Sequence, residues 1–187
     1  MDKKYTMNLP VKVNKLKNQR CYLSGAMDRV SDGGVGWREK ISVYLKARNV
    51  VVLDPCKKPI NIGFEDSENR ENRQKLKQQG HYDHIASDMR VIRNTDLRMV
   101  DISDFLIVNL DLDVHPCGTY EELFLANRQM KPIIVRVEQG KEATPDWLLG
   151  AIPHDNIFGK WEELTDYLDN INYDNIRPKK RWLFFDL

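Results

Sequence analysis

A glutamate close to the start of a predicted helix is the residue best suited to covalent chemistry. Glu122 follows a turn through Pro116 and Gly118 and lies in the first turn of a helix expected over residues 119–130. There, free backbone N–H groups and the helix dipole favour a negative charge, which keeps a carboxylate ionised and positioned. A carboxylate of this kind can attack the anomeric carbon of a sugar.

The same spacing also has an interpretation as a helix cap. Thr119 followed three residues later by Glu122 matches a capping box, in which both side chains bond to backbone N–H groups at the helix start. The two roles compete, because a carboxylate bonded back to the cap is less free to attack a substrate. From this motif alone, both roles remain open.

Asp96 favours the catalytic interpretation. A helix is expected over residues 83–100, and its apolar stripe runs through Ile85, Met89, Ile92, Met99 and Val100. Asp96 lies four residues after Ile92 and three before Met99, so helical spacing places it on the apolar face. An inward-facing carboxylate near the C-terminal end of a helix is unfavourable unless it is paired or has a function.

Short apolar runs predict the strands that must position these groups. They cover residues 20–23, 50–53, 105–110 and 133–137 and are rich in β-branched side chains. Such runs are typical of strands covered on both faces, as in a parallel sheet. Helical patterns alternate with them at residues 35–47, 83–100, 119–130 and 161–168. The sequence therefore predicts a three-layer α/β sandwich with a central parallel sheet of about five strands.

The substrate pocket is expected at the carboxyl ends of the strands, where open parallel sheets bind their ligands. Small residues after the first strand let backbone N–H groups approach a sugar or phosphate closely. An aspartate follows the third strand, and two further small residues precede Glu122. We therefore expect the substrate to contact Gly25, Ala26, Met27, Asp111, Gly118 and Thr119.

A metal site is not expected. His81 and His84 are three residues apart, and His115 lies near Cys117, but no two matched pairs stand at the spacing of zinc ligands. The chain also contains neither a GxGxxG pattern nor a Walker motif, which argues against a nucleoside triphosphate site.

The composition indicates one soluble domain. The chain has 187 residues, of which 41% are hydrophobic and 30% charged, and a net charge of +1. This charge provides no general field to attract nucleic acid or an anionic membrane. We find no secretory signal and no apolar segment of bilayer length. Three widely separated cysteines indicate a reducing compartment, so we expect a cytoplasmic protein.

The chain divides into a main domain and three segments of different character. We expect a polar leader over residues 1–18, one α/β domain over residues 19–170, and a tail over residues 171–187. Residues 57–80 are almost free of apolar side chains and are predicted to be a surface insertion, either a solvated linker or a short helix or lid. The apolar tail around Trp182 should dock on its own subunit or on a neighbour.

Three motifs together resemble the nucleoside 2-deoxyribosyltransferase superfamily, including its nucleotide N-hydrolase branch. The first is Tyr22-Leu23-Ser24-Gly25, and the second joins Asp96-Leu97 to Asp104 and the apolar strand that follows. The third is Gly118-Thr119-Tyr120-Glu121-Glu122-Leu123, followed by Ala126 and by Lys131-Pro132. The third motif is similar to phage-encoded relatives, and the resemblance covers roughly residues 20–137.

The resemblance implies a flavodoxin-like fold and an enzyme that cleaves an N-glycosidic bond. It implies that Glu122 attacks C1′ of a 2′-deoxynucleoside or its monophosphate and forms a covalent deoxyribosyl-enzyme. A second base or water then takes the sugar. The resemblance places Asp96 at the nucleobase, Tyr22 beside the nucleophile and Gly25 at the sugar or phosphate. It further implies no cofactor, no nucleic-acid polymer as partner, and a homo-oligomer of two or more subunits.

Two residues depart from the pattern of the family. Pro116 stands where a polar Asp or Ser is usual, and Phe124 stands in place of a glycine. His115 and Cys117 are the candidates to replace the missing polar contact. Two alternatives to the deoxyribosyltransferase therefore remain open, namely a nucleotide-binding module without catalysis and a hydrolase of NAD-like nucleotides.

Overall fold

Five parallel strands form the centre of the protein. The computed structural model describes residues 13–27, 30–58, 67–177 and 181–182, and its sheet order is β2-β1-β3-β4-β5. All neighbouring strands are parallel. The predicted α/β fold is confirmed, although the last strand has only two residues and produces no apolar run. The strands are β1 (Arg20–Gly25), β2 (Val51–Leu53), β3 (Phe105–Leu110), β4 (Ile133–Val137) and β5 (Ile157–Phe158).

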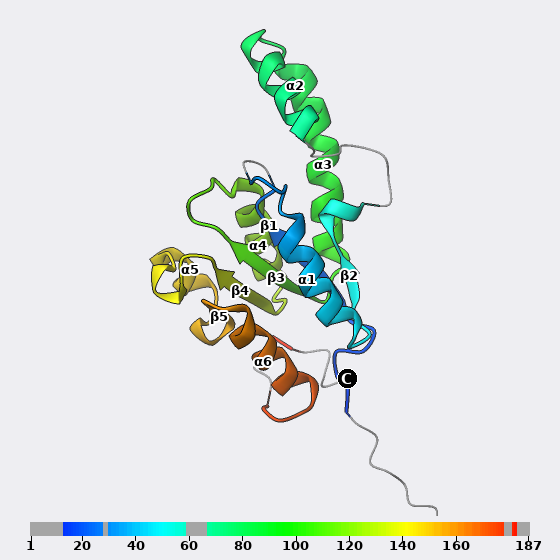
Figure 1. Ribbon diagram of the computed structural model, residues 1–187, viewed down its shortest axis with the longest axis vertical. Helices are drawn as coiled ribbons and strands as arrows, with labels where there is room; N and C mark the ends of the chain where they lie inside the picture. Colours follow the sequence, from blue (N-terminus) through cyan, green and yellow to red (C-terminus); the bar gives the residue numbers. More distant parts are fainter. Residues whose placement is uncertain (1–12, 28–29, 59–66, 178–180, 183–187) are drawn as a thin grey trace, which may run out of the picture.

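Helices cover both faces of the sheet and complete three layers (Figure 1). On one face lie α1 (Val35–Lys46) and α6 (Trp161–Asn172), and on the other lie α3 (Tyr82–Ile102) and α4 (Cys117–Arg128). The connections hold α5 (Asp146–Ala151) and the 3-10 helices η1 (Pro55–Lys57), η2 (Lys141–Ala143) and η3 (His154–Asn156). Within the described ranges, no helix has both the length and the apolar character needed to cross a bilayer.

The alternation of side chains along β1 separates the two halves of the core. Tyr22 packs on the side of α4, whereas Cys21 and Leu23 pack on the side of α1 and α6, because successive strand residues face opposite ways. The sheet order places β1 and β3 side by side although β2 lies between them in sequence. Their carboxyl ends therefore flank the crevice in which folds of this type bind ligands.

The predicted surface insertion contains a helix. Residues 67–78 form α2 (Ser67–Gln78), which packs against α3 and projects beyond the sheet (Figure 1). Most of its residues are Glu, Gln, Arg or Lys, which are good helix formers, so the helix is compatible with its polar composition. The remainder of the insertion at residues 59–66 lies outside the described residues.

Both ends of the described chain pack on the domain. Leu16 is completely buried, and Trp182 is only 2% exposed. The ring of Trp182 lies 5.4 Å from that of Phe105 in β3, measured between centroids. The Trp182 indole N–H also donates to Tyr167 Oη at 3.4 Å. This part of the tail therefore docks on its own chain, while residues 1–12 and 183–187 lie outside the described residues.

Candidate active site

Three side chains meet at the carboxyl end of β1. Tyr22 Oη donates a hydrogen bond of 2.8 Å to Glu122 Oε1, and Ser24 Oγ donates a short hydrogen bond to Glu122 Oε2. Tyr22 and Ser24 are two residues apart on the strand, so both side chains face α4, which carries Glu122. Each oxygen of the carboxylate has its own O–H donor, and the orientation of the carboxylate is thereby fixed.

Glu122 lies deeper in its helix than the sequence predicts. The helix α4 begins at Cys117, so Glu122 is its sixth residue and belongs to the second turn. Its N-cap is Pro116, which makes no side-chain cap, and Thr119 is buried inside the helix. The capping-box interpretation is therefore wrong. The placement of Glu122 among the free N–H groups of the first turn is wrong for the same reason.

The environment of Glu122 shifts its protonation. Removal from solvent raises the pKa of Glu122 to about 7, an effect that outweighs the lowering by the hydrogen bonds from Ser24 and Tyr22. The carboxylate is thus neither fully ionised nor fully protonated near neutral pH, unlike the ionised group predicted at a helix start. Burial also raises the pKa of Tyr22 well above its usual range, so its hydroxyl remains a donor.

We expect Glu122→Gln to stabilise the protein at pH 8.5 and to change little at pH 5. The folded state binds the Glu122 proton more tightly than the unfolded state does, since the pKa rises from 4.5 to about 7 on folding. This contribution to stability is complete below pH 4.5 and is lost as the pH rises through 7. The neutral amide avoids that loss and should raise the free energy of unfolding by about 1–3 kcal/mol at pH 8.5.

Urea denaturation at the two pH values measures this effect. The exposed Glu142 provides a matched control, because Glu142→Gln removes a carboxylate of the same type from a solvated position. The control should show no such dependence on pH. A Glu122→Gln effect of equal size at pH 5 and pH 8.5 would contradict the raised pKa.

Asp96 is buried, as the helical spacing predicts, and it is paired with a lysine. Asp96 is only 8% exposed, and Lys58 Nζ lies 2.8 Å from Asp96 Oδ1 and 3.0 Å from Asp96 Oδ2. Burial raises the pKa of Asp96, while the ammonium group of Lys58 opposes this shift. A buried carboxylate next to a single ammonium group can hold or release a proton, depending on what else occupies the site.

One cavity of about 390 Å³ connects Glu122 with Asp96. This volume is within the range of small-molecule sites. Apolar side chains of α3, among them Met89 and Ile92, form part of its wall. His115 and Cys117, the candidates to replace the polar residue expected at position 116, line the cavity on either side of Pro116. The cavity also brings together most of the residues predicted to bind substrate, namely Gly25, Ala26, Met27, Gly118 and Thr119.

Asp111 is not brought together with Glu122. It lines a second cavity, of about 630 Å³, with Trp37 and Trp161 of α1 and α6. Its carboxylate accepts hydrogen bonds from Gln139 Nε2 at 2.7 Å and from the backbone N–H of Asp113 at 3.0 Å. Successive side chains along a strand face opposite sides of the sheet. Leu110, the last residue of β3, packs on the α4 side, so the side chain of Asp111 faces the other side, away from Glu122.

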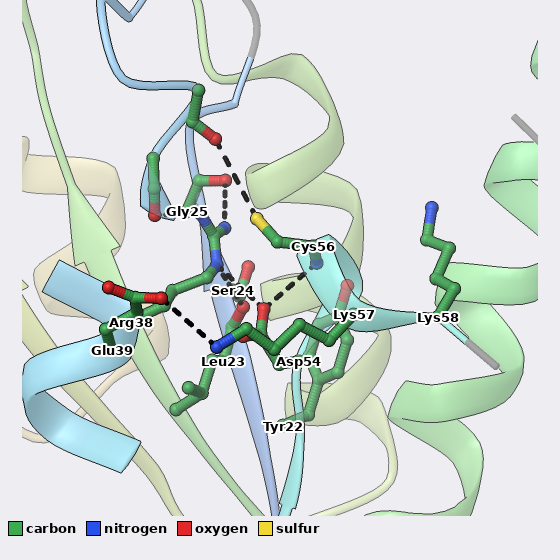
Figure 2. A network of polar contacts seen from close by, with 12 residues as sticks. Tyr22, Leu23, Ser24, Gly25, Arg38, Glu39, Asp54, Cys56, Lys57 and Lys58 are labelled. Carbon is green, nitrogen blue, oxygen red and sulfur yellow. Dashed lines mark hydrogen bonds and ion pairs between the residues drawn. The ribbon is translucent and has the colours of Figure 1, made fainter. Parts of the chain in front are cut away.

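A buried arginine holds the loop at the end of β1. Arg38 of α1 has no exposed surface, and its guanidinium donates to the carbonyl oxygens of Leu23 at 3.2 Å, Gly25 at 2.7 Å and Gly34 at 2.8 Å. Asp54 Oδ1 lies 3.9 Å from Arg38 Nε and balances its charge. Figure 2 shows Arg38 reaching from its helix to the strand that carries Tyr22 and Ser24. The network fixes the strand end from which the donors to Glu122 project.

Gly25 is required where β1 meets α1. A Cβ atom at this position would lie 2.8 Å from a ring carbon of Trp37 and 2.9 Å from the carbonyl oxygen of Asn109. Both distances are shorter than a carbon atom allows without movement of its neighbours. The glycine of the first motif therefore has a packing role in addition to its place in the cavity wall.

The arrangement of the elements is shared with solved structures. A 2-deoxyribosyltransferase from Bacillus psychrosaccharolyticus aligns with a TM-score of 0.56 at 15% identity, over 79% of this chain and 91% of that one. The 2-deoxyribosyltransferase from Leishmania mexicana aligns with a TM-score of 0.51 at 18% identity, over 80% of this chain and 96% of that one. The chain has the 2-deoxyribosyltransferase fold.

A third solved structure aligns less well, and the sequence itself matches no family model and no curated protein. A CMP N-glycosidase from Clostridium botulinum aligns with a TM-score of 0.46 at 17% identity, over 81% of this chain and 98% of that one. Comparison of the sequence with protein-family models and with curated proteins finds no match.

Within the part of the chain that the structure describes, no three His, Cys, Asp or Glu side chains are grouped to hold a metal ion.

On this 2-deoxyribosyltransferase fold, the site includes six polar residues that the sequence did not predict for it: Ser24, Lys58, Arg73, Lys77, Arg93 and Glu121. Ser24 had a detectable signal, because a residue two positions after Tyr22 on a strand shares its face. Lys58 had none, since it reaches Asp96 across 38 residues of sequence. Arg73 and Lys77 belong to the segment predicted as a surface insertion.

Proposed function

We propose that the protein cleaves the N-glycosidic bond of a 2′-deoxynucleoside or its 5′-monophosphate, with Glu122 as the nucleophile. The observation that carries this proposal is the carboxylate of Glu122, held by Tyr22 and Ser24 in the same cavity as the buried Asp96. The shared fold with two 2-deoxyribosyltransferases supports it. The deoxyribosyl group then passes to a second base or to water.

In the first step, a carboxylate oxygen of Glu122 forms a bond to C1′ while the bond between C1′ and the base nitrogen breaks. The bonding electrons leave with the base, which takes up a proton. In the second step, a nitrogen of another base or a water oxygen attacks C1′, the ester bond to Glu122 breaks, and the attacking group loses a proton. A pKa of about 7 leaves enough ionised Glu122 for attack at neutral pH.

Asp96 is suited to supply the proton that the departing base needs. Burial raises the pKa of Asp96, so its carboxyl group takes up a proton more readily than a solvated aspartate does. After the proton has moved to the base, the ammonium group of Lys58, 2.8 Å away, stabilises the carboxylate that remains. In the second step Asp96 takes a proton back from the attacking group. The pair thus returns to its starting state after each turnover.

Incubation with deoxynucleosides and their 5′-monophosphates, with and without a second free base, tests the proposal. We expect release of the first base and, when the second base is present, a new nucleoside or nucleotide. Chromatography separates the products, and intact-protein mass spectrometry after acid quenching should detect a deoxyribosyl adduct. Binding without any turnover would instead identify a non-catalytic module. Release of nicotinamide from NAD, with no reaction of deoxynucleosides, would identify the third alternative.

A further inference from the structure

Two basic residues of α2 line the cavity of Glu122. Arg73 and Lys77 are four residues apart, so they lie on the same face of the helix. Arg73 and Glu122 are both half-buried, whereas Lys77 is exposed. Glu122 is held against β1 by Tyr22, and the two cations come to the same cavity from α2, which projects beyond the sheet.

The other charged groups of this cavity are already balanced. Lys58 Nζ lies 2.8 Å from Asp96 Oδ1, and Arg93 forms a two-pronged ion pair with Glu121, with 2.7 Å between Nε and Oε2. By contrast, the side chains of Arg73 and Lys77 form no ion pair or hydrogen bond with any other residue that the structure describes. With Glu122 close to half protonated at neutral pH, the charged side chains around the cavity carry an excess of positive charge.

We propose that Arg73 and Lys77 bind a phosphate group carried by the deoxyribose, so that the enzyme prefers deoxynucleotides over deoxynucleosides. The inference rests on the proposed function, because the sugar is placed by Glu122. A phosphate monoester carries close to two negative charges at neutral pH, which matches the two cations. The arginine fork can hold two phosphate oxygens at once, and the lysine adds a compact charge.

The layout of the cavity is consistent with such a ligand. With C1′ at Glu122 and the base directed along α3 toward Asp96, the rest of the sugar and its substituent face the remaining wall. That wall is formed by residues 25–27 at the end of β1, residues 115–119 before Glu122, and α2, in which Arg73 and Lys77 are the cations. An uncharged nucleoside would leave both cations without a partner, whereas a nucleotide would neutralise them.

The test compares the double substitution Arg73→Gln with Lys77→Gln against Lys75→Gln. Lys75 is an exposed lysine of the same helix that does not line the cavity. For each variant, kcat/KM of base release is measured with one deoxynucleoside and with its 5′- and 3′-monophosphates. We expect the double variant to lose about 10- to 100-fold with the preferred monophosphate and less than about 2-fold with the nucleoside. Lys75→Gln should behave like the unaltered protein.

A binding measurement separates this inference from the proposed function. Calorimetric titration of the monophosphate into Glu122→Gln, with and without the double substitution, needs no turnover. Weaker binding in the triple variant would support the phosphate site even if no base were released. Equal kcat/KM for nucleoside and monophosphates, or a monophosphate preference that survives in the double variant, would overturn the phosphate site while leaving glycosidic cleavage intact. A 5′-phosphorylated oligonucleotide that binds more tightly than the monophosphate would overturn the small-molecule assignment.

Discussion

Glu122→Ala should lower kcat for base release by at least about 10³-fold, a loss of roughly 4 kcal/mol of transition-state stabilisation. No other carboxylate of the described cavity wall is placed to take over the attack. Asp96 is paired with Lys58, and Glu121 is paired with Arg93 at the protein surface. Without the carboxylate, the sugar would have to lose its base without a covalent partner.

Two additional measurements make this prediction specific. Added formate should restore part of the rate of Glu122→Ala, because a small anion can occupy the space of the missing carboxylate and attack C1′. The exposed Glu142 supplies the control, since Glu142→Ala removes a glutamate that contributes to neither cavity. Circular dichroism verifies that each variant is folded. Unchanged base release in a folded Glu122→Ala protein would rule out Glu122 as the nucleophile.

Arg38→Met should lower the free energy of unfolding by about 3–5 kcal/mol. The substitution removes a buried guanidinium and leaves the carbonyl oxygens of Leu23, Gly25 and Gly34 without their donor. It also removes the cation closest to the buried Asp54. Unpaired buried polar groups carry the full cost of their lost hydration, which methionine cannot offset by packing alone.

Urea denaturation at pH 7 measures the loss. Lys46→Met is the matched control, because Lys46 is an exposed cation on the same helix and its replacement should change stability by less than about 0.5 kcal/mol. Arg38→Lys should fall between the two, since it keeps the charge but reaches fewer acceptors. A loss below about 1 kcal/mol for Arg38→Met would show that the end of β1 is held by other contacts.

The main elements followed from local patterns in the sequence. The apolar runs at residues 105–110 and 133–137 coincide with β3 and β4, because a strand covered on both faces needs apolar side chains at nearly every position. The burial of Asp96 also followed, since helical spacing alone places it between Ile92 and Met99. These inferences depend only on neighbours in the sequence.

The chemistry of the site depended on contacts that no local pattern encodes. Tyr22 is 100 residues from Glu122 in the sequence, and Lys58, which pairs with Asp96, directly follows the 3-10 helix η1. The start of α4 was misplaced by two residues, because Cys117 and Gly118 have weak helical propensity and were interpreted as a turn. With the helix starting at Cys117, Thr119 is no cap and Glu122 belongs to the second turn, where its removal from solvent raises its pKa.

The two ends of the cavity are tied to the fold to different degrees. Tyr22 and Ser24 stand on β1, which is bonded to β2 and β3, so their geometry persists until the sheet itself unfolds. Arg73 and Lys77 stand on a hairpin of two helices that projects beyond the sheet (Figure 1). Sequence change in that hairpin can therefore alter which molecules the cavity admits at little cost to the sheet or to the hydrogen bonds of Glu122. On such a scaffold, the preference for a ligand can change while the geometry around Glu122 is kept.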